Sequence, residues 1–172
     1  MSAEPVTEAQ AMEAFDAAID PRYFEVLREV GGWYMAFRAG VRERRPRIDR
    51  ILVPTAELRA LGWTEVIAVE GKRPGVKLGP AISQAIDYTW AIFERGGRHF
   101  KPSAIFVWPV DETIRGPVES VMLQNRVGHC EIREGNDVSF FFGQARMLRL
   151  IGDSVSANFD LFMRTGRTVG SR

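Results

Sequence analysis

The 172-residue chain is long enough for one domain with a substantial core, and its 45% hydrophobic and 26% charged residues are ordinary for a globular protein. No hydrophobic run approaches the ~20 residues of a membrane span, and the N-terminus lacks the features of a secretory signal, so we expect a cytoplasmic protein that does not enter membranes. The single cysteine excludes an internal disulfide, a four-cysteine zinc site and a cysteine-ligated iron–sulfur cluster.

The first half of the chain predicts two helices followed by two strands. "TEAQAMEAFDAAI" has its hydrophobic residues at helical spacing, with Thr7 as the N-cap. Pro21 is expected to start a second short helix, "PRYFEVLREV", which Gly31-Gly32 would end. "WYMAFRAGV" and "RIDRILVP" are typical of strands, and Pro54 ends the second one.

The middle of the chain predicts a buried strand and a long helix. "AELRALG" indicates a short helical connection, and "TEVIAVEGKR" is hydrophobic on both faces before Glu70, as a central strand is. Gly79-Pro80 is expected to begin the helix "PAISQAIDYTWAIFERGG", which would end at the glycine pair 96–97. Its hydrophobic stripe would consist of Ile82, Ala85, Ile86, Thr89 and Phe93.

The last third predicts a strand, a helix and a hairpin. "SAIFVWPV" is expected to be a strand, "GPVESVMLQNRV" a helix, and "HCEIREG" with "DVSFFFGQARML" a terminal hairpin, while the tail after Gly152 is weakly patterned. The order of elements therefore predicts a single α/β domain, residues 1–172, with a mixed sheet.

Three charged side chains are expected to meet on this sheet. Residues of a strand alternate between its faces, so Glu70 and Lys72 point to one side, about 7 Å apart along the chain. Asp49 would be the neighbour of Glu70 if the two strands pair. Two adjacent carboxylates repel each other, and burying them is costly unless a cation joins them. Mg2+ or Mn2+ suits such oxygen ligands, and Lys72 could then orient a water molecule or stabilise charge on phosphorus. These groups are those of phosphodiester hydrolysis.

This pattern resembles the PD-(D/E)XK nucleases. "RIDRILVP" supplies the first carboxylate, Asp49, and "VIAVEGKR" the E-x-K element that ends at Lys72. "QAIDY" is similar to the Q-x-x-x-Y motif of the RecB-like branch of that family, carried here by Gln84 and Tyr88. The resemblance implies a restriction-endonuclease-like core of helix, three strands, helix and strand, covering about residues 20–110. Residues 111–172 would be C-terminal additions.

The resemblance also implies further site residues. The carbonyl of Gly71 would be a metal ligand, and Gln84 would serve catalysis and, with Tyr88, the positioning of the substrate strand. An upstream acid on the first core helix would be a ligand as well. Glu25 and Glu29 are both candidates for it, and Glu25 is favoured.

Basic residues precede Asp49. The stretch "RAGVRERRPRIDR", 38–50, holds six arginines against two acidic residues. Such a run is more often a solvated face than a nucleic-acid site. Because it borders Asp49, Arg42, Arg44 and Arg45 are nevertheless candidates for contacts with DNA phosphates.

Two functional hypotheses follow. The first is a metal-dependent DNA nuclease of the RecB-like type, with a junction-resolving or restriction-like endonuclease of the same family as a variant of it. The second is a catalytically silent nucleic-acid-binding or assembly module on the same fold. Homodimerisation is compatible with the first, because a small nuclease often has to act on two strands. The tryptophans are expected in the core or at its rim, and the sequence gives no support to base stacking by them.

Overall fold

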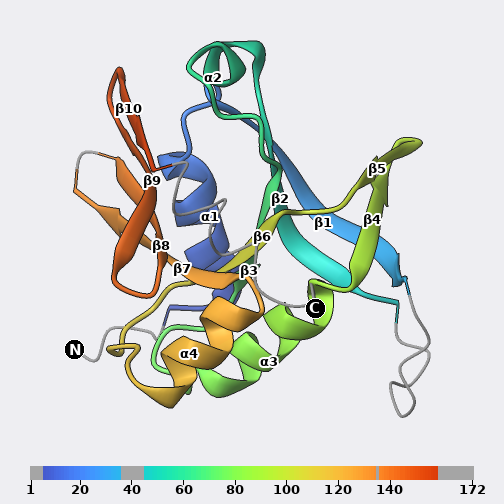
Figure 1. Cartoon of the computed structure of the whole chain (residues 1–172), viewed down its shortest axis with the longest axis vertical. Helices are drawn as coiled ribbons and strands as arrows, with labels where there is room; N and C mark the ends of the chain where they lie inside the picture. The colour runs from blue at the N-terminus through green and yellow to red at the C-terminus, as the bar shows by residue number, and fades with distance from the viewer. Residues whose placement is uncertain (1–5, 36–44, 135, 159–172) are drawn as a thin grey trace, which may run out of the picture.

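The computed structural model describes residues 6–35, 45–134 and 136–158 (Figure 1). Its helices are α1 (Glu8–Ala18), α2 (Ala56–Ala60), α3 (Gly79–Tyr88) and α4 (Pro117–Gln124). Its strands are β1 (Phe24–Tyr34), β2 (Arg47–Pro54), β3 (Ile67–Gly71), β4 (Ala91–Arg95), β5 (Arg98–Phe100), β6 (Ala104–Trp108), β7 (Val127–Arg133), β8 (Asp137–Phe142), β9 (Ala145–Ile151) and β10 (Ser154–Ala157). In the part of the chain described, no helix is both long and hydrophobic enough to cross a membrane.

All of these strands belong to one ten-stranded sheet in the order β10-β9-β8-β7-β6-β3-β2-β1-β4-β5. The pairs β3–β6 and β6–β7 are parallel, and the other neighbouring pairs are antiparallel. The prediction of an α/β chain with a mixed sheet is therefore confirmed. The strands β7–β10, expected as additions to a core, extend the same sheet.

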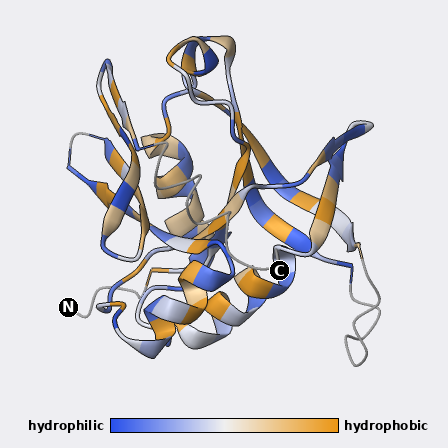
Figure 2. Ribbon diagram, viewed as in Figure 1, coloured by the Kyte–Doolittle hydropathy of each residue, from blue (hydrophilic) through white to orange (hydrophobic). Residues whose placement is uncertain are grey.

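Two hydrophobic clusters stabilise the sheet. One contains Met12 and Phe15 of α1 together with residues of β3, β6, β8 and β9. The other contains α3, Met122 of α4 and residues of β1, β2, β4 and β6, and α3 and α4 lie together below the sheet in Figure 1. Hydrophobic and hydrophilic residues alternate along β1 and β4 in Figure 2, as expected for strands with one buried face. β2 is buried on both faces from Arg50 to Pro54.

Several predicted elements are confirmed. The first helix is α1, and Thr7 forms a capping box with Gln10. The strands expected around Asp49, Glu70 and Phe106 are β2, β3 and β6, and the expected short connector and later helix are α2 and α4.

The second predicted helix is wrong, because residues 24–34 form β1. Seven register pairs, from Phe24↔Pro54 to Gly31↔Arg47, join this segment to β2. Its helical spacing of hydrophobic residues does not prevail, because pairing buries Phe24 and Val30 in the sheet. The strand expected at residues 33–41 corresponds to the end of β1 up to Tyr34, and its residues 36–41 lie outside the described part.

The long helix expected at residues 80–97 ends at Tyr88, and residues 91–95 form β4. Ala91 and Phe93 are buried on one face of β4, an alternation that only a strand can present. The glycine pair 96–97, expected to end a helix, instead forms the turn of the β4–β5 hairpin, with φ of 59° and 75°. Positive φ at both central residues is what a type I′ hairpin turn requires.

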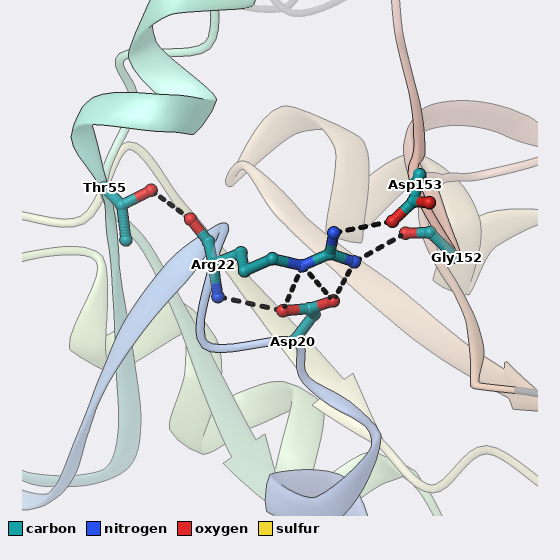
Figure 3. Close-up of polar contacts among 5 residues, drawn as sticks. All are labelled: Asp20, Arg22, Thr55, Gly152 and Asp153. Carbon is teal, nitrogen blue, oxygen red and sulfur yellow. Dashed lines mark hydrogen bonds and ion pairs between the residues drawn. The ribbon is translucent and has the colours of Figure 1, made fainter.

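The predicted terminal hairpin is confirmed in part. β7 and β8 pair as expected, but "DVSFFFGQARML" breaks at Gly143 into β8 and β9, and the tail after Gly152 adds β10. The β9–β10 turn is joined to the N-terminal half by Arg22, whose guanidinium bonds Asp20, the carbonyl of Gly152 and Asp153 (Figure 3). Asp153 is 88% exposed, so this surface network contributes little to stability.

Candidate active site

Asp49 and Glu70 lie side by side where β2 and β3 pair. The register Arg50↔Val69 and Ile51↔Ala68, continued by one residue, places Asp49 opposite Glu70. Asp49 Oδ2 accepts a hydrogen bond of 2.7 Å from the backbone N–H of Gly71. The two strands therefore pair as expected, and the pairing brings the two carboxylates together. The catalytic roles of Asp49 and Glu70 stay predictions.

Gly71 allows this close approach. A Cβ at this position would lie 2.6 Å from Met12 Sδ of α1 and 3.1 Å from Asp49 Oδ2. The first of these distances is shorter than van der Waals contact permits, so a Cβ would force the Met12 side chain to move and would crowd the Asp49 carboxylate. A glycine here lets the strand end, the helix and the carboxylate meet. The expected role of its carbonyl as a ligand stays a prediction.

The Glu70 carboxyl is buried, and no described residue forms an ion pair with it. Its residue is 5% exposed, and its Oε2 atom has no hydrogen-bond partner among the described residues. Burial, the charge of Asp49 and the charge of Glu8, in that order, raise the pKa of Glu70 to about 9. Burial also raises the pKa of Asp49, although the Gly71 N–H acts in the opposite direction. Without a cation, Glu70 therefore keeps its proton at neutral pH, because a second buried negative charge beside Asp49 would be unfavourable.

Glu8, an exposed residue, is electrostatically coupled to Asp49 and Glu70, and sequence reasoning missed it. It lies in the first turn of α1, and burial and the charge of Asp49 raise its pKa. The signal was present, because an acid directly after Thr7 sits at the positive end of a correctly predicted helix. The predicted helix at residues 21–30 instead directed the search for an upstream acid to Glu25 and Glu29.

The favoured upstream acid, Glu25, lies elsewhere. It is on β1, where both carboxylate oxygens accept hydrogen bonds from Arg98 on β5 at 3.0–3.1 Å. Its alternative, Glu29, forms an exposed ion pair with Arg47, but it lies opposite Asp49 in the β1–β2 register and its charge raises the pKa of Asp49. The structure therefore does not group Glu25 with Asp49 and Glu70, and the expectation of a ligand there is corrected. The prediction of Glu25 as a ligand depended on a helix at residues 21–30, and most of that segment is the strand β1 instead.

Lys72 is anchored by a loop. Its Nζ donates to the carbonyl of Val76 and to Asp111 Oδ1, each at 2.8 Å, and its side chain is 5% exposed. Asp111 Oδ2 also accepts from the N–H of Gly75, so one carboxylate holds both the ammonium and the loop. These hydrogen bonds lower the pKa of Asp111. Lys72 is thus rigidly placed, with Asp111 rather than Glu70 as its ionic partner.

Gln84 and Tyr88 share a face of α3, as predicted. Gln84 Nε2 donates to the Tyr88 hydroxyl at 2.8 Å. Burial raises the pKa of Tyr88, and the charges of Glu70 and Asp49 raise it further, so the phenol is close to both carboxylates. Tyr88 is therefore buried near the acidic residues, whereas Gln84 is exposed at the helix surface.

The arginine run is only partly described. Arg42 and Arg44 lie outside the described residues, whereas Arg45 is exposed just before β2. Arg47 is exposed as well, and its charge lowers the pKa of Asp49, which places its guanidinium near the site.

The described residues contain no three His, Cys, Asp or Glu side chains arranged so that they could hold a metal ion as they stand. The site does fit a cation in its chemistry, because three electrostatically coupled carboxylates include a buried oxygen without a partner. Comparisons with models of known protein families, with curated proteins and with solved structures found no match.

Proposed function

We propose that this chain is a divalent-metal-dependent deoxyribonuclease of the PD-(D/E)XK type, related to the RecB-like branch. The observation that supports it most is the Glu70 carboxyl, which is buried opposite Asp49 with one oxygen unpartnered. An apolar residue would stabilise this position better, so retaining two adjacent acids at the end of a central strand indicates a cationic ligand.

The topology supports the same proposal. The order is a helix (α1), three antiparallel strands (β1, β2, β3), a helix (α3) and a strand (β6) parallel to β3. This is the order that the resemblance implies, with α2 and the β4–β5 hairpin inserted. The sheet places the carboxyl end of β3, which carries Glu70, beside the carboxyl end of β6.

Each residue would have a defined role in hydrolysis. Asp49, Glu70 and Glu8 would bind Mg2+ or Mn2+, with the Gly71 carbonyl as a further ligand. The bound ion would supply Lewis-acid activation of the phosphodiester and of the attacking water. Lys72, held by Asp111, would stabilise the charge that develops on phosphorus. Gln84 would orient the Tyr88 hydroxyl toward the substrate strand.

Three substitutions test the proposal. Asp49→Asn, Glu70→Gln and Lys72→Ala should each abolish Mn2+-dependent cleavage of linear DNA while the proteins remain folded by circular dichroism. Glu57→Gln, which changes an exposed acid on α2, is the matched control and should cleave normally. Equal cleavage by all four variants would exclude these residues from the chemistry.

One observation favours the second hypothesis, a catalytically silent nucleic-acid-binding or assembly module. The carboxylates do not already form a set of metal ligands, and the ionic partner of Lys72 is Asp111. Calorimetry with Mn2+ separates the two. The nuclease should bind Mn2+ with a signal that Glu70→Gln removes, whereas a silent module should show no such signal even with DNA present.

A further inference from the structure

Two of the four tryptophans lie exposed on one sheet face. Where β1, β4 and β5 pair, Ala91, Phe93 and Phe100 are buried on the inner face. On the opposite face, Trp33 is 42% exposed, Met35 41% and Trp90 52%. The outer face of an antiparallel sheet is normally polar, so this concentration of large exposed hydrophobic side chains indicates a binding surface.

The register brings these side chains together. Trp33 lies opposite Ile92, and the N–H of Met35 donates to the carbonyl of Trp90 at 2.9 Å, so Trp90 is one step along the same pairing. From β5, the His99 ring stands edge-on to Trp33 with centroids 5.3 Å apart, and Lys101 Nζ lies 3.2 Å from Met35 Sδ. We name these five residues, Trp33, Met35, Trp90, His99 and Lys101, the tryptophan face.

Cationic side chains connect this face with the candidate active site. The N–H of Gly32 bonds the carbonyl of Pro46, and Gly31 pairs with Arg47, so Arg45 is the residue opposite Trp33. Arg45 and Arg47 are exposed and alternate with the buried Pro46, and the next residue of the same alternation is Asp49. Two exposed cationic side chains therefore lie along β2 between the tryptophan face and the acidic residues, and Arg47 is also ion-paired with Glu29.

We propose that the tryptophan face binds single-stranded DNA, with bases stacked on Trp33 and Trp90 and phosphates beside Arg45, Arg47 and Lys101. Exposed aromatic rings flanked by cations match the two parts of a single strand, its bases and its phosphates. Duplex DNA keeps its bases inside and cannot use the rings in this way. The proposal that this face binds single-stranded DNA depends only on the exposed rings and the cations described above. Only the further step, that the bound strand is delivered to Asp49, rests on the proposed nuclease function.

A second copy of this chain fits the face less well. A two-fold contact is isologous, so the patch would meet itself. It would bring the Arg45 and Lys101 of both copies into one interface, where like charges oppose association. DNA phosphates would be attracted by the same charges.

The test measures binding of a fluorescein-labelled 20-nucleotide oligothymidylate by anisotropy, with EDTA present so that no cleavage occurs. Trp33→Ala and Trp90→Ala should each weaken binding roughly 5- to 150-fold, the loss of one stacked base. Leu61→Ala, at a hydrophobic residue that is 57% exposed beyond α2, is the control and should bind like the wild type. Arg45→Ala should reduce the slope of log affinity against log salt by about 0.7.

Intrinsic fluorescence gives a second readout on the unchanged protein. Stacked bases should quench the emission of Trp33 and Trp90, and the double variant Trp33→Phe, Trp90→Phe should lose most of this quenching. Unchanged affinity and quenching in the tryptophan variants would overturn the proposal. So would a dimer in sedimentation that Trp33→Ala dissociates without any effect on DNA binding. If the wild type binds DNA through these tryptophans yet never cleaves it, the nuclease proposal fails and this one stands.

Discussion

The buried Glu70 carboxyl predicts that, without metal, the protein loses stability as the pH rises. Its pKa is about 9 in the folded protein, against an ordinary value of 4.5. The folded state therefore keeps a proton that the unfolded state has released. Between these two pH values, the free energy of unfolding falls as the pH increases, because deprotonation of Glu70 opposes folding. Below pH 4.5, both states hold the proton and the effect disappears.

The magnitude follows from the linkage relation. One proton bound only by the folded state gives a slope of about 1.4 kcal/mol per pH unit. From pH 6 to pH 8, the wild type should thus lose up to about 2.7 kcal/mol relative to Glu70→Gln, which mimics the protonated acid. This is an upper value, because Asp49 and Glu8 titrate together with Glu70. For a chain of this length, it corresponds to a relative fall in Tm of about 5–11 °C.

The assay is urea or thermal unfolding of both proteins in EDTA at pH 6, 7 and 8, followed by circular dichroism. Titrating groups outside the cluster of Glu70, Asp49 and Glu8 are the same in both proteins and cancel in the comparison. Mn2+ at about 100 times its Kd should restore about 2.7 kcal/mol to the wild type and nothing to Glu70→Gln. A parallel pH dependence of the two proteins in EDTA would refute the assignment of a buried, uncompensated carboxyl to this position.

Three further predictions follow from the contacts. Gly71→Ala should destabilise the fold by about 1–3 kcal/mol, measured by urea unfolding, because a Cβ there is 2.6 Å from a side chain of α1; a stability equal to the wild type would contradict the packing described. Asp16→Ala should lower the free energy of unfolding by about 3–5 kcal/mol in the same assay, because the buried guanidinium of Arg50 loses its two hydrogen bonds to Asp16, of 2.6 and 3.0 Å. A loss below 1 kcal/mol would argue against this ion pair. Asp111→Asn should lower the free energy of unfolding by about 1.5–3 kcal/mol through the weakened hold on Lys72, with Mn2+ affinity by calorimetry unchanged; a loss of Mn2+ affinity would place Asp111 among the ligands instead.

The sequence predicts well the elements whose own pattern decides their structure. The capping box at Thr7 and the hydrophobic strands β2, β3 and β6 are recognisable locally, because period, cap and proline all agree. The pairing of β2 with β3 follows from their adjacency, and with it the meeting of Asp49 and Glu70. The spacing of Gln84 and Tyr88 fixed their common helix face for the same reason.

The elements that were wrong are those decided by partners distant in the sequence. Residues 24–34 and 91–95 both have a spacing compatible with a helix, but each becomes a strand by pairing, β1 with β2 and β4 with β1. Local propensity cannot reveal such a partner. The error at β1 led to the prediction of Glu25 as the upstream acid, whereas the structure couples Glu8 electrostatically to Asp49 and Glu70. The error at β4 concealed the exposure of Trp90 on the same sheet face as Trp33.

The central claim is tested most directly by incubating a 5′-labelled single-stranded DNA with the wild type and with Glu70→Gln, in Mg2+, in Mn2+ and in EDTA. Products are resolved on a denaturing gel. The account predicts that the wild type shortens the DNA in either metal and not in EDTA, and that Glu70→Gln leaves it intact under all three conditions. Cleavage by the wild type in EDTA, equal cleavage by the variant, or intact DNA with a metal-loaded wild type would contradict it.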